Sequence, residues 1–427
     1  MTVLLLFGVF FVLMLIGVPI AVSLGLSSLI MMVFATDSSP NVIVQKAFTS
    51  LDSFPLMAIP FFILAGVLMS TGGISERLLN LANVLIGFIT GGLAMVTVLA
   101  SMFFAAISGS GPATVAGIGS FMIPSMRQKN YGGGFAAAIT ASAGSVGVLI
   151  PPSIPFVMYG VVGTVSIGSM FLAGIIPGII LGLSLMLVSF FVAKKEGYAG
   201  SGKIPTFMDV LKALNEAKLA LLIPVIILGG IYAGLFSPTE SAAVASVYAL
   251  IVGVFVYKEI NFKELYKAFS SAALTSATTV IIIGFSISFA YLMTRERIPV
   301  IIADFIVSIS ENPIVILLII NLFLLIVGMF IDTISAIVIL TPILLPVVTD
   351  LGMDPIQFGV ILVMNLAIGF VTPPLGVNLF VASTVGKVPF EKIVKAMVPI
   401  LIVMIAALLL VTYVPELSTW LPELIST

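Results

Sequence analysis

Long uninterrupted apolar segments dominate the chain, for example residues 3–34, 54–71, 169–193 and 394–414. An α-helix needs about 20 apolar residues to cross a bilayer, whereas a membrane β-barrel shows alternating segments of about ten residues. Of the 427 residues, 60% are hydrophobic and only 8% are charged. A compact fold in water could not hide so much apolar surface behind so few charges. The sequence therefore predicts an all-α polytopic membrane protein in contact with the lipid bilayer.

The residue types that most often carry out enzyme chemistry are missing. The chain has no Cys and no His, which excludes thiolate nucleophiles, Cys-ligated metals and imidazole bases. The net charge is −1 and the basic residues form no cluster, so we expect no nucleic-acid partner. These absences favour a transport protein rather than an enzyme, and we expect no organic cofactor.

The spacing of the prolines indicates an internal duplication. Because proline is costly inside a helix, a repeated spacing marks equivalent helix breaks in two copies of one unit. Four prolines recur 222 residues later, in the pairs Pro124 and Pro346, Pro151 and Pro373, Pro152 and Pro374, and Pro177 and Pro399. We assign residues 1–193 to a first repeat and residues 238–427 to a second. Residues 194–237 are assigned to a cytoplasmic linker and a connecting helix over 218–235. Spanning helices are expected over 3–34 and 54–71 in the first repeat and over 238–257 and 271–294 in the second.

Each repeat contains two short apolar segments joined by a polar break. In the first repeat the break at 108–112 lies within residues 93–126, and in the second Asp332 and Thr333 lie within residues 314–348. Each half looks too short to cross the bilayer, so each pair is predicted to form a re-entrant hairpin with its tip near mid-membrane. The alternative is a pair of ordinary short helices joined by a loop outside the membrane.

A Pro pair then interrupts a further apolar segment in each repeat, at 134–165 and at 356–382. These interruptions predict two broken helices, although the Pro pairs could also produce simple kinks. The fold predicted from these features has inverted repeats with two re-entrant hairpins and two broken helices. Such an arrangement is typical of secondary transporters, in which a core that moves against a scaffold gives alternating access.

The distribution of basic residues predicts the orientation. In this parse, 14 of the 17 basic residues lie on the side of the N-terminus, and only Lys46, Arg295 and Arg297 lie on the other. The positive-inside rule then places the N-terminus in the cytoplasm and the C-terminus outside. Five crossings separate equivalent elements, and because this number is odd the two repeats are inverted. The first hairpin therefore opens from the cytoplasm and the second from outside.

The helix breaks supply the candidate binding groups. Free helix N-termini attract anions, and freed carbonyl groups bind cations such as sodium, so we expect transport of an anion together with sodium ions. The candidate substrate-binding residues are Ser108, Ser110, Ser153, Arg295, Asp332 and Asn378. The candidate sodium-binding residues are Ser108, Gly109, Ser145, Gly147, Gly328, Asp332, Thr333, Ser335, Gly369 and Thr372.

Several of these candidates also have a purely structural interpretation. Ser108 and Ser110 could simply allow close helix packing. Asp332 is costly near the bilayer centre unless a cation, hydrogen-bond donors or a proton accompany it, and it could instead cap the hairpin tip. Arg295 could anchor a carboxylate with its planar fork, or it could extend its charge to the membrane interface.

The motifs at the breaks resemble those of the large membrane subunit of tripartite ATP-independent periplasmic (TRAP) transporters. They are Ser-Gly-Ser-Gly-Pro-Ala-Thr at 108–114, Ile-Pro-Pro-Ser at 150–153, Thr-Pro-Pro at 372–374, Gly-Val-Pro-Ile-Ala at 17–21, and Pro-Phe-Phe at 60–62 followed by Ala-Gly at 65–66. The resemblance covers essentially the whole chain. In that family the hairpin serines and the equivalents of Arg295 and Asp332 are expected near the site.

The resemblance implies an elevator-type ion transporter fold in the bacterial inner membrane. It implies sodium-driven uptake of an organic acid such as sialic acid or a C4-dicarboxylate. It also implies two protein partners, a small four-helix membrane subunit and a soluble periplasmic substrate-binding protein. An ion channel built from re-entrant loops is the main alternative. An intramembrane enzyme that uses Ser110 as nucleophile is a weaker one, since the usual base is missing.

Overall fold

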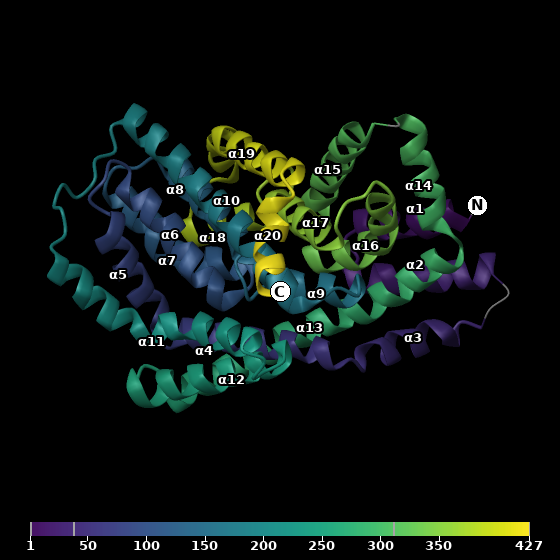
Figure 1. Ribbon diagram of the computed structural model, residues 1–427, viewed down its shortest axis with the longest axis horizontal. Coiled ribbons are helices and arrows are strands. Elements are labelled where there is room, and N and C mark those ends of the chain that lie inside the picture. Colours follow the sequence, from purple (N-terminus) through teal and green to yellow (C-terminus); the bar gives the residue numbers. More distant parts are fainter. Residues whose placement is uncertain (1, 37–38, 311, 427) are drawn as a thin grey trace.

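The computed structural model describes residues 2–36, 39–310 and 312–426, and all regular secondary structure in this part of the chain is helical (Figure 1). By length and composition, eight helices of the described residues are long and apolar enough to cross a membrane, and six shorter helices are also apolar. The prediction of an all-α polytopic membrane protein is confirmed.

The helices of the N-terminal half are α1 (Thr2–Leu15), α2 (Ile20–Ala35), α3 (Asn41–Leu51), η1 (Phe54–Met57), α4 (Ala58–Thr71), α5 (Ile74–Ile86), α6 (Gly92–Ser108), α7 (Gly111–Gln128), α8 (Gly133–Ser145), η2 (Val146–Val148), α9 (Ile154–Val162) and α10 (Ile167–Glu196). Those of the C-terminal half are α11 (Phe207–Tyr232), α12 (Pro238–Ile251), η3 (Val252–Val256), α13 (Phe262–Arg295), α14 (Ile298–Ile309), α15 (Pro313–Phe330), α16 (Thr333–Asp350), α17 (Pro355–Gly369), α18 (Val377–Gly386), α19 (Phe390–Tyr413) and α20 (Glu416–Ser426).

The first apolar segment, expected to be one spanning helix over 3–34, is instead two helices that pack against each other. Gly17 adopts a left-handed backbone conformation with φ of 86°. Its N–H donates to Met14 O, and Val18 N–H donates to Leu13 O, which is the hydrogen-bond pattern of a Schellman helix end. Pro19 follows and cannot continue the helix. The prediction of one helix was wrong because the apolar composition continues through this local stop.

Three further helices differ from the sequence expectation. The helix expected over 271–294 is α13, which is 34 residues long and starts at an Asn261–Glu264 capping box. The connecting helix expected over 218–235 is α11, which starts at Phe207 behind a second capping box. The C-terminal helix α20 was not predicted. It packs against α10 and α17.

The two predicted hairpins are present as α6–α7 and α15–α16. The arms of the second are longer than expected, because α15 and α16 have 18 residues each and satisfy the length for a membrane span. Arm length therefore does not identify these pairs as re-entrant. The two pairs have in common that their tips line the same cavity inside the folded chain.

The two predicted broken helices are also present. Residues between η2 and α9, and between α17 and α18, interrupt the helices at the Pro151–Pro152 and Pro373–Pro374 pairs, and both pairs contain a cis peptide bond. The second halves cross between the repeats: α9 packs against α16 and α17, and α18 packs against α7 and α8. Each hairpin is thus held by the broken helix of the other repeat.

One hydrogen bond joins equivalent positions of the two repeats. The hydroxyl of Ser145 donates to Ala367 O at 2.7 Å, and these residues are separated by the repeat spacing of 222. When equivalent positions of two copies contact each other, they lie close to a twofold axis that relates the copies. The outer layer, formed by α2, α3, α4, α12 and α13, follows the same relation. α2 packs against α13, and α12, the counterpart of α2, packs against α4, the counterpart of α13. In Figure 1, α3, α4, α12 and α13 run along one side of the molecule.

Candidate functional site

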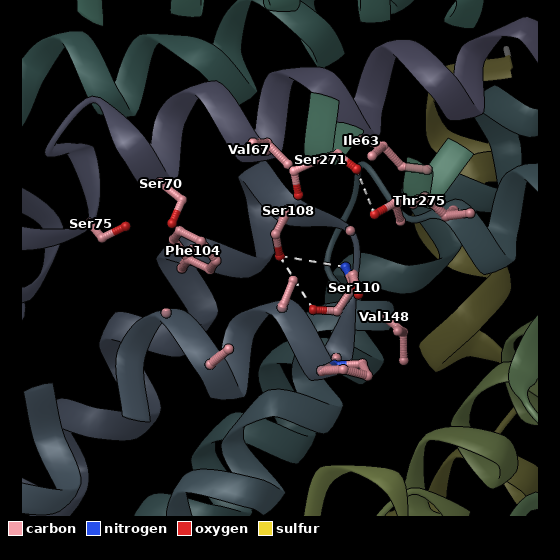
Figure 2. Close-up of a pocket in the computed structure, with 18 of the residues that line it drawn as sticks. Ile63, Val67, Ser70, Ser75, Phe104, Ser108, Ser110, Val148, Ser271 and Thr275 are labelled. Carbon is pink, nitrogen blue, oxygen red and sulfur yellow. Dashed lines mark hydrogen bonds between the residues drawn. The ribbon is translucent and has the colours of Figure 1, made fainter. Parts of the chain in front are cut away.

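A cavity of about 830 Å³ lies between the two hairpin tips and the layer formed by α4 and α13. Figure 2 shows Ser70, Ser108 and Ser271 around this space, each from a different helix. Residues of both tips line it, namely Ser108, Gly109, Ser110, Gly111, Pro112, Ala113, Asp332, Thr333 and Ile334. Five of the candidate residues predicted from the sequence are therefore brought together, namely Ser108, Gly109, Ser110, Asp332 and Thr333.

The first tip is held by hydroxyl groups. Ser108 Oγ lies 2.9 Å from Thr114 Oγ1, and Thr114 Oγ1 donates to Ser110 O at 2.8 Å. Gly109 has a φ of 57°, and a Cβ added there would lie 2.7 Å from Pro152 O, so the turn requires glycine. Ser110 precedes α7, but its side chain makes no capping hydrogen bond. The N–H groups of Gly111 and Ala113 are left without a side-chain acceptor beside the cavity, and Pro112 between them has no N–H.

The second tip is built differently. Asp332 precedes α16, and its Oδ1 accepts hydrogen bonds from Ile334 N–H at 3.0 Å and Ser335 N–H at 3.1 Å. Its Oδ2 accepts from the hydroxyl of Ser335 at 2.5 Å. This carboxylate has the geometry of a helix N-cap, where the helix dipole also favours a negative charge. Thr333 Oγ1 is buried and has no hydrogen-bond partner among the described residues.

The first-repeat sodium candidates lie at the junction of hairpin and broken helix. Gly147 lies against the first tip, since a Cβ there would lie 2.7 Å from Thr114 Oγ1 and 3.1 Å from Ser110 O. Ser145 faces the second repeat through its bond to Ala367 O. Both residues are buried and lie outside the set that lines the cavity.

Asn378 reaches the same junction from α18. Its Nδ2 donates to Ala141 O at 3.1 Å and to Ser145 Oγ at 3.4 Å, while its Oδ1 is buried without a partner among the described residues. Ser153 caps α9, because its hydroxyl accepts from Phe156 N–H at 3.3 Å and donates to Val148 O. Neither side chain belongs to the cavity lining.

The second-repeat sodium candidates Gly328 and Gly369 touch through their backbones. A Cβ added to Gly369 would lie 2.4 Å from the carbonyl carbon of Gly328, so these glycines allow α15 and α17 to cross closely. Thr372 donates to Ile368 O at 2.8 Å. Ser335 is buried and its hydroxyl is bonded to Asp332. None of these four residues lines the cavity.

Arg295 is the last residue of α13 and is exposed. It lies outside the cavity lining, so the structure does not bring it together with the hairpin tips. This position suits a side chain that extends along the surface of the protein.

The structure adds residues that the sequence reading did not select. Ser271, Thr275 and Thr279 line the cavity from α13, and Glu76 and Glu259 line it beside Gly73. The first three are four residues apart, a spacing that places hydroxyl groups on one face of a helix and that could have been found. No comparable pattern marks the two glutamates, which come from separate segments.

Glu259 is also part of a contact between the two halves of the chain. Its Oε1 lies 2.8 Å from Arg77 of α5, whose guanidinium lies 3.7 Å from the ring centroid of Tyr257. Arg77 itself does not line the cavity. Among the described residues that do, the charged side chains are Glu76, Glu259 and Asp332, and none is basic.

Known proteins of similar sequence are TRAP transporter permeases. The isethionate TRAP transporter permease protein DctMQ of Oleidesulfovibrio alaskensis is 50% identical over 412 residues, which are 96% of this chain and 65% of that longer protein. The sialic acid TRAP transporter large permease protein SiaM of Vibrio cholerae is 41% identical, with 96% of this chain and 95% of that protein covered. The C4-dicarboxylate TRAP transporter large permease protein DctM of Pseudomonas aeruginosa is 44% identical, with 94% of each chain covered.

A solved structure supports the fold. The crystal structure of the Alcanivorax borkumensis YdaH transporter matches with a TM-score of 0.65 and 13% identity, covering 90% of each chain. The model of the family described as the DctM component of tripartite ATP-independent periplasmic transporters matches residues 7–417. This chain therefore belongs to the DctM component family of the TRAP transporters.

Proposed function

We propose that the chain is the large permease subunit of a sodium-coupled importer of an organic acid anion. Its family membership makes it a membrane-embedded transport protein rather than an enzyme. In this proposal it lies in the bacterial inner membrane, with the N-terminus in the cytoplasm and the C-terminus in the periplasm. Its partners are a small four-helix membrane subunit and a periplasmic binding protein that delivers the substrate.

The observation that carries the proposal is the cavity shared by both hairpin tips. Its volume of about 830 Å³ lies in the range of small-molecule sites. The start of α7 offers N–H groups at one side of this cavity, and helix N-termini are common binding sites for carboxylate and sulfonate-like anions. The relatives named above are permeases for isethionate, sialic acid and C4-dicarboxylates, and all three are organic acids.

The charge of the cavity supports coupling to cations. Three carboxylates and no basic side chain belong to its described lining. Glu259 is paired with Arg77 outside the lining, so Glu76 and Asp332 are the charges that give an organic anion a negative potential there. Cations bound together with the anion would offset this repulsion. Sodium is the co-substrate that we propose, held by oxygen atoms near the first tip (Ser108, Gly109, Ser145 and Gly147) and near the second (Gly328, Asp332, Thr333, Ser335, Gly369 and Thr372).

The packing supports an elevator mechanism. The hairpins and broken helices of the two repeats hold each other through α7–α18 and α9–α16 contacts, and α2, α3, α4, α12 and α13 form a second group with contacts of its own. The two groups meet where α13 packs against α16 and where α4 packs against α6. In the proposed cycle the first group moves as one body past the second and carries the cavity with it. The cavity lies between these two groups, where such a movement would open and close it.

Uptake by the reconstituted complex tests the proposal. Proteoliposomes that contain both membrane subunits should take up isethionate, N-acetylneuraminate or succinate when the cognate binding protein is supplied. An inward sodium gradient should raise the initial rate severalfold over a potassium gradient, and the rate should saturate with substrate. Equal uptake in sodium and potassium would contradict the coupling. Unitary ionic currents without saturable uptake would favour a channel.

A further inference from the structure

The cavity has one closed end and one exposed end. At the tips, Ser108 and Thr333 are only 5% and 4% exposed, whereas Ser271 and Glu259 at the other end of the lining are exposed. Glu259 is paired with Arg77, one of the basic residues that the positive-inside rule places in the cytoplasm. Beyond the second tip, α16 packs against α13 and α14. In the proposed orientation, the cavity therefore opens toward the cytoplasm and is closed toward the periplasm.

One face of α13 runs from the exposed end of the cavity into its closed end. Ser271, Thr275 and Thr279 line the cavity from this face. The same helical spacing continues the face through Ile283, Ser286, Ala290 and Met293. These four side chains are at most 8% exposed. Because α13 packs against α16, we infer that this buried continuation faces the second hairpin.

Ser286 is the exception among the buried hydroxyl groups of α13. Thr279 Oγ1 donates to Thr275 O at 2.9 Å, and Ser288 Oγ donates to Ile43 O of α3 at 2.9 Å. The hydroxyl of Ser286 is fully buried and has no hydrogen-bond partner among the described residues. Buried polar groups in folded proteins are nearly always bonded. An unpaired hydroxyl on the contact surface of two groups of helices suggests a position of the molecule in which it is bonded.

Movement of the hairpins along α13 supplies the missing partner. Thr279 and Ser286 are seven residues apart, which corresponds to about 10 Å along a helix. In the proposed elevator cycle, the hairpins move past α13 toward the periplasm. A movement of about 10 Å carries the second tip along the α13 face by the distance from Thr279 to Ser286. Water or substrate in the cavity then reaches the hydroxyl of Ser286.

We propose that Ser286 lines the cavity when the cavity opens to the periplasm. The α13 face then offers hydroxyl groups to the cavity in both positions: those of Ser271 and Thr275 in the position described here, and that of Ser286 in the other. This inference rests on the proposed function and adds to it a residue of the entry route. The hydroxyl of Ser286 is buried and unpaired in one position and bonded in the other.

Thiol accessibility tests the proposal. The chain has no Cys, so Ser286→Cys, Ser271→Cys and Ser288→Cys each introduce a single thiol. Ser288→Cys is the matched control, because Ser288 is on the same helix and is 1% exposed, but its hydroxyl is bonded to α3 within the outer layer. The variants are assembled with the small membrane subunit in vesicles of known orientation. Labelling is read on this chain after the subunits have been separated.

The expected labelling depends on the side of the membrane. In right-side-out vesicles, a membrane-impermeant maleimide should label Ser286→Cys at least about tenfold faster than Ser288→Cys. In inside-out vesicles, the same reagent should label Ser271→Cys faster than Ser286→Cys, since Ser271 is exposed at the cytoplasmic end.

The outcomes separate this inference from the proposed function. Equal labelling of Ser286→Cys and Ser288→Cys, in vesicles that retain saturable sodium-driven uptake, would contradict the role of Ser286 and leave the transporter in place. Labelling of Ser286→Cys mainly from the cytoplasmic side would contradict it as well. Absence of sodium-driven uptake in the unsubstituted complex would instead overturn the proposed function.

Alanine at the same two positions provides a second measurement. Ser286→Ala removes a hydroxyl that has no partner in this position, so the melting temperature should stay the same or rise. Ser288→Ala removes the bond to Ile43 O and should lower the melting temperature. The initial uptake rate of Ser286→Ala should fall severalfold, because the variant favours the position described here. Uptake by Ser286→Ala equal to that of the unsubstituted complex would contradict a hydroxyl that is bonded in only one of the two positions.

Discussion

Asp332 illustrates how one carboxylate is tolerated in an apolar chain. Transfer of an Asp to the centre of a membrane helix costs roughly 2.5–3.5 kcal/mol on insertion scales. Two N–H groups and one hydroxyl compensate this cost here. The helix dipole stabilises the negative charge further. The hydrogen bonds account for the position of the carboxylate without an ion. These three bonds use three of the roughly four lone-pair positions of the carboxylate, so one position of Oδ2 remains for the sodium ion that we propose.

Gly147 gives a test of the first tip at the scale of one residue. Gly147→Ala should lower the transport rate by at least about tenfold, because its Cβ would press on Thr114 Oγ1 and Ser110 O and displace the tip. Overpacking of this kind costs roughly 1–3 kcal/mol, so most of the protein should remain folded. Initial uptake rates and thermal unfolding of the same preparations would measure both effects.

Gly229→Ala is the control for this substitution. Gly229 lies in α11, where an added Cβ would meet no described atom within 4 Å. This variant should transport normally and gain up to about 1 kcal/mol from helix propensity. Equal transport by the two variants would show that the tip tolerates the extra methyl group.

At the scale of helices, the buried amides of α15 and α17 connect three elements. Asn365 Nδ2 donates to Asn321 Oδ1 at 2.6 Å, and Asn321 Nδ2 donates to Thr412 Oγ1 of α19 at 3.2 Å. All three side chains are at most 3% exposed. Hydrogen bonds between membrane helices contribute about 0.6 kcal/mol on average and up to about 1.7 kcal/mol. This group therefore holds the second hairpin to the broken helix and to α19.

A double-mutant cycle measures this connection. Asn321→Leu and Asn365→Leu should each destabilise the protein, because each leaves a buried polar partner unpaired. The double variant should be less destabilised than the sum of the two, with a coupling of about 0.6–1.7 kcal/mol in the unfolding free energy. Denaturant unfolding in detergent would provide the values. Strict additivity would mean that the amide contact contributes nothing.

The sequence predicted elements best where the physical cause is local. Proline and glycine act on their own backbone, so the hairpin tip at 108–112 and both Pro-pair breaks were placed correctly. The tip at 332–333 was also placed correctly, because Asp332 is a polar residue that caps α16. The stop at Gly17 is equally local and was missed only because the surrounding residues are apolar. The start of α13 was missed because the capping box at Asn261 was not used.

The candidate site was predictable in part for the same reason. The tip residues Ser108, Ser110 and Asp332 were found because a helix break reveals them. The lining residues Thr275 and Glu259 were not, since they face the first tip only after segments more than 140 residues apart in sequence have packed. Arg295 was selected for its chemistry, and it lies at the end of α13 outside the cavity lining. Its part in anion binding therefore stays a prediction beside the alternative of a charge that extends to the membrane interface.

At the scale of the whole molecule, the central question is whether the hairpins move past the outer layer. Gly66 of α4 touches the first tip, because a Cβ on Gly66 would lie 3.2 Å from Ser108 Cα. These residues belong to the two groups of helices that the elevator proposal treats as separate bodies. Their contact must break in every cycle if the proposal is right.

A disulfide between these two positions therefore locks one state. The chain contains no Cys, so Gly66→Cys with Ser108→Cys creates a single possible pair without any background substitution. Oxidation of this double variant should reduce uptake to below about one tenth, and a reductant should restore it, because the reduced pair leaves both bodies free to move. The single variants should not respond to oxidant or reductant. Full uptake by a completely oxidised double variant would show that α4 and the first hairpin travel together, and the boundary between moving and fixed parts would then lie elsewhere in the molecule.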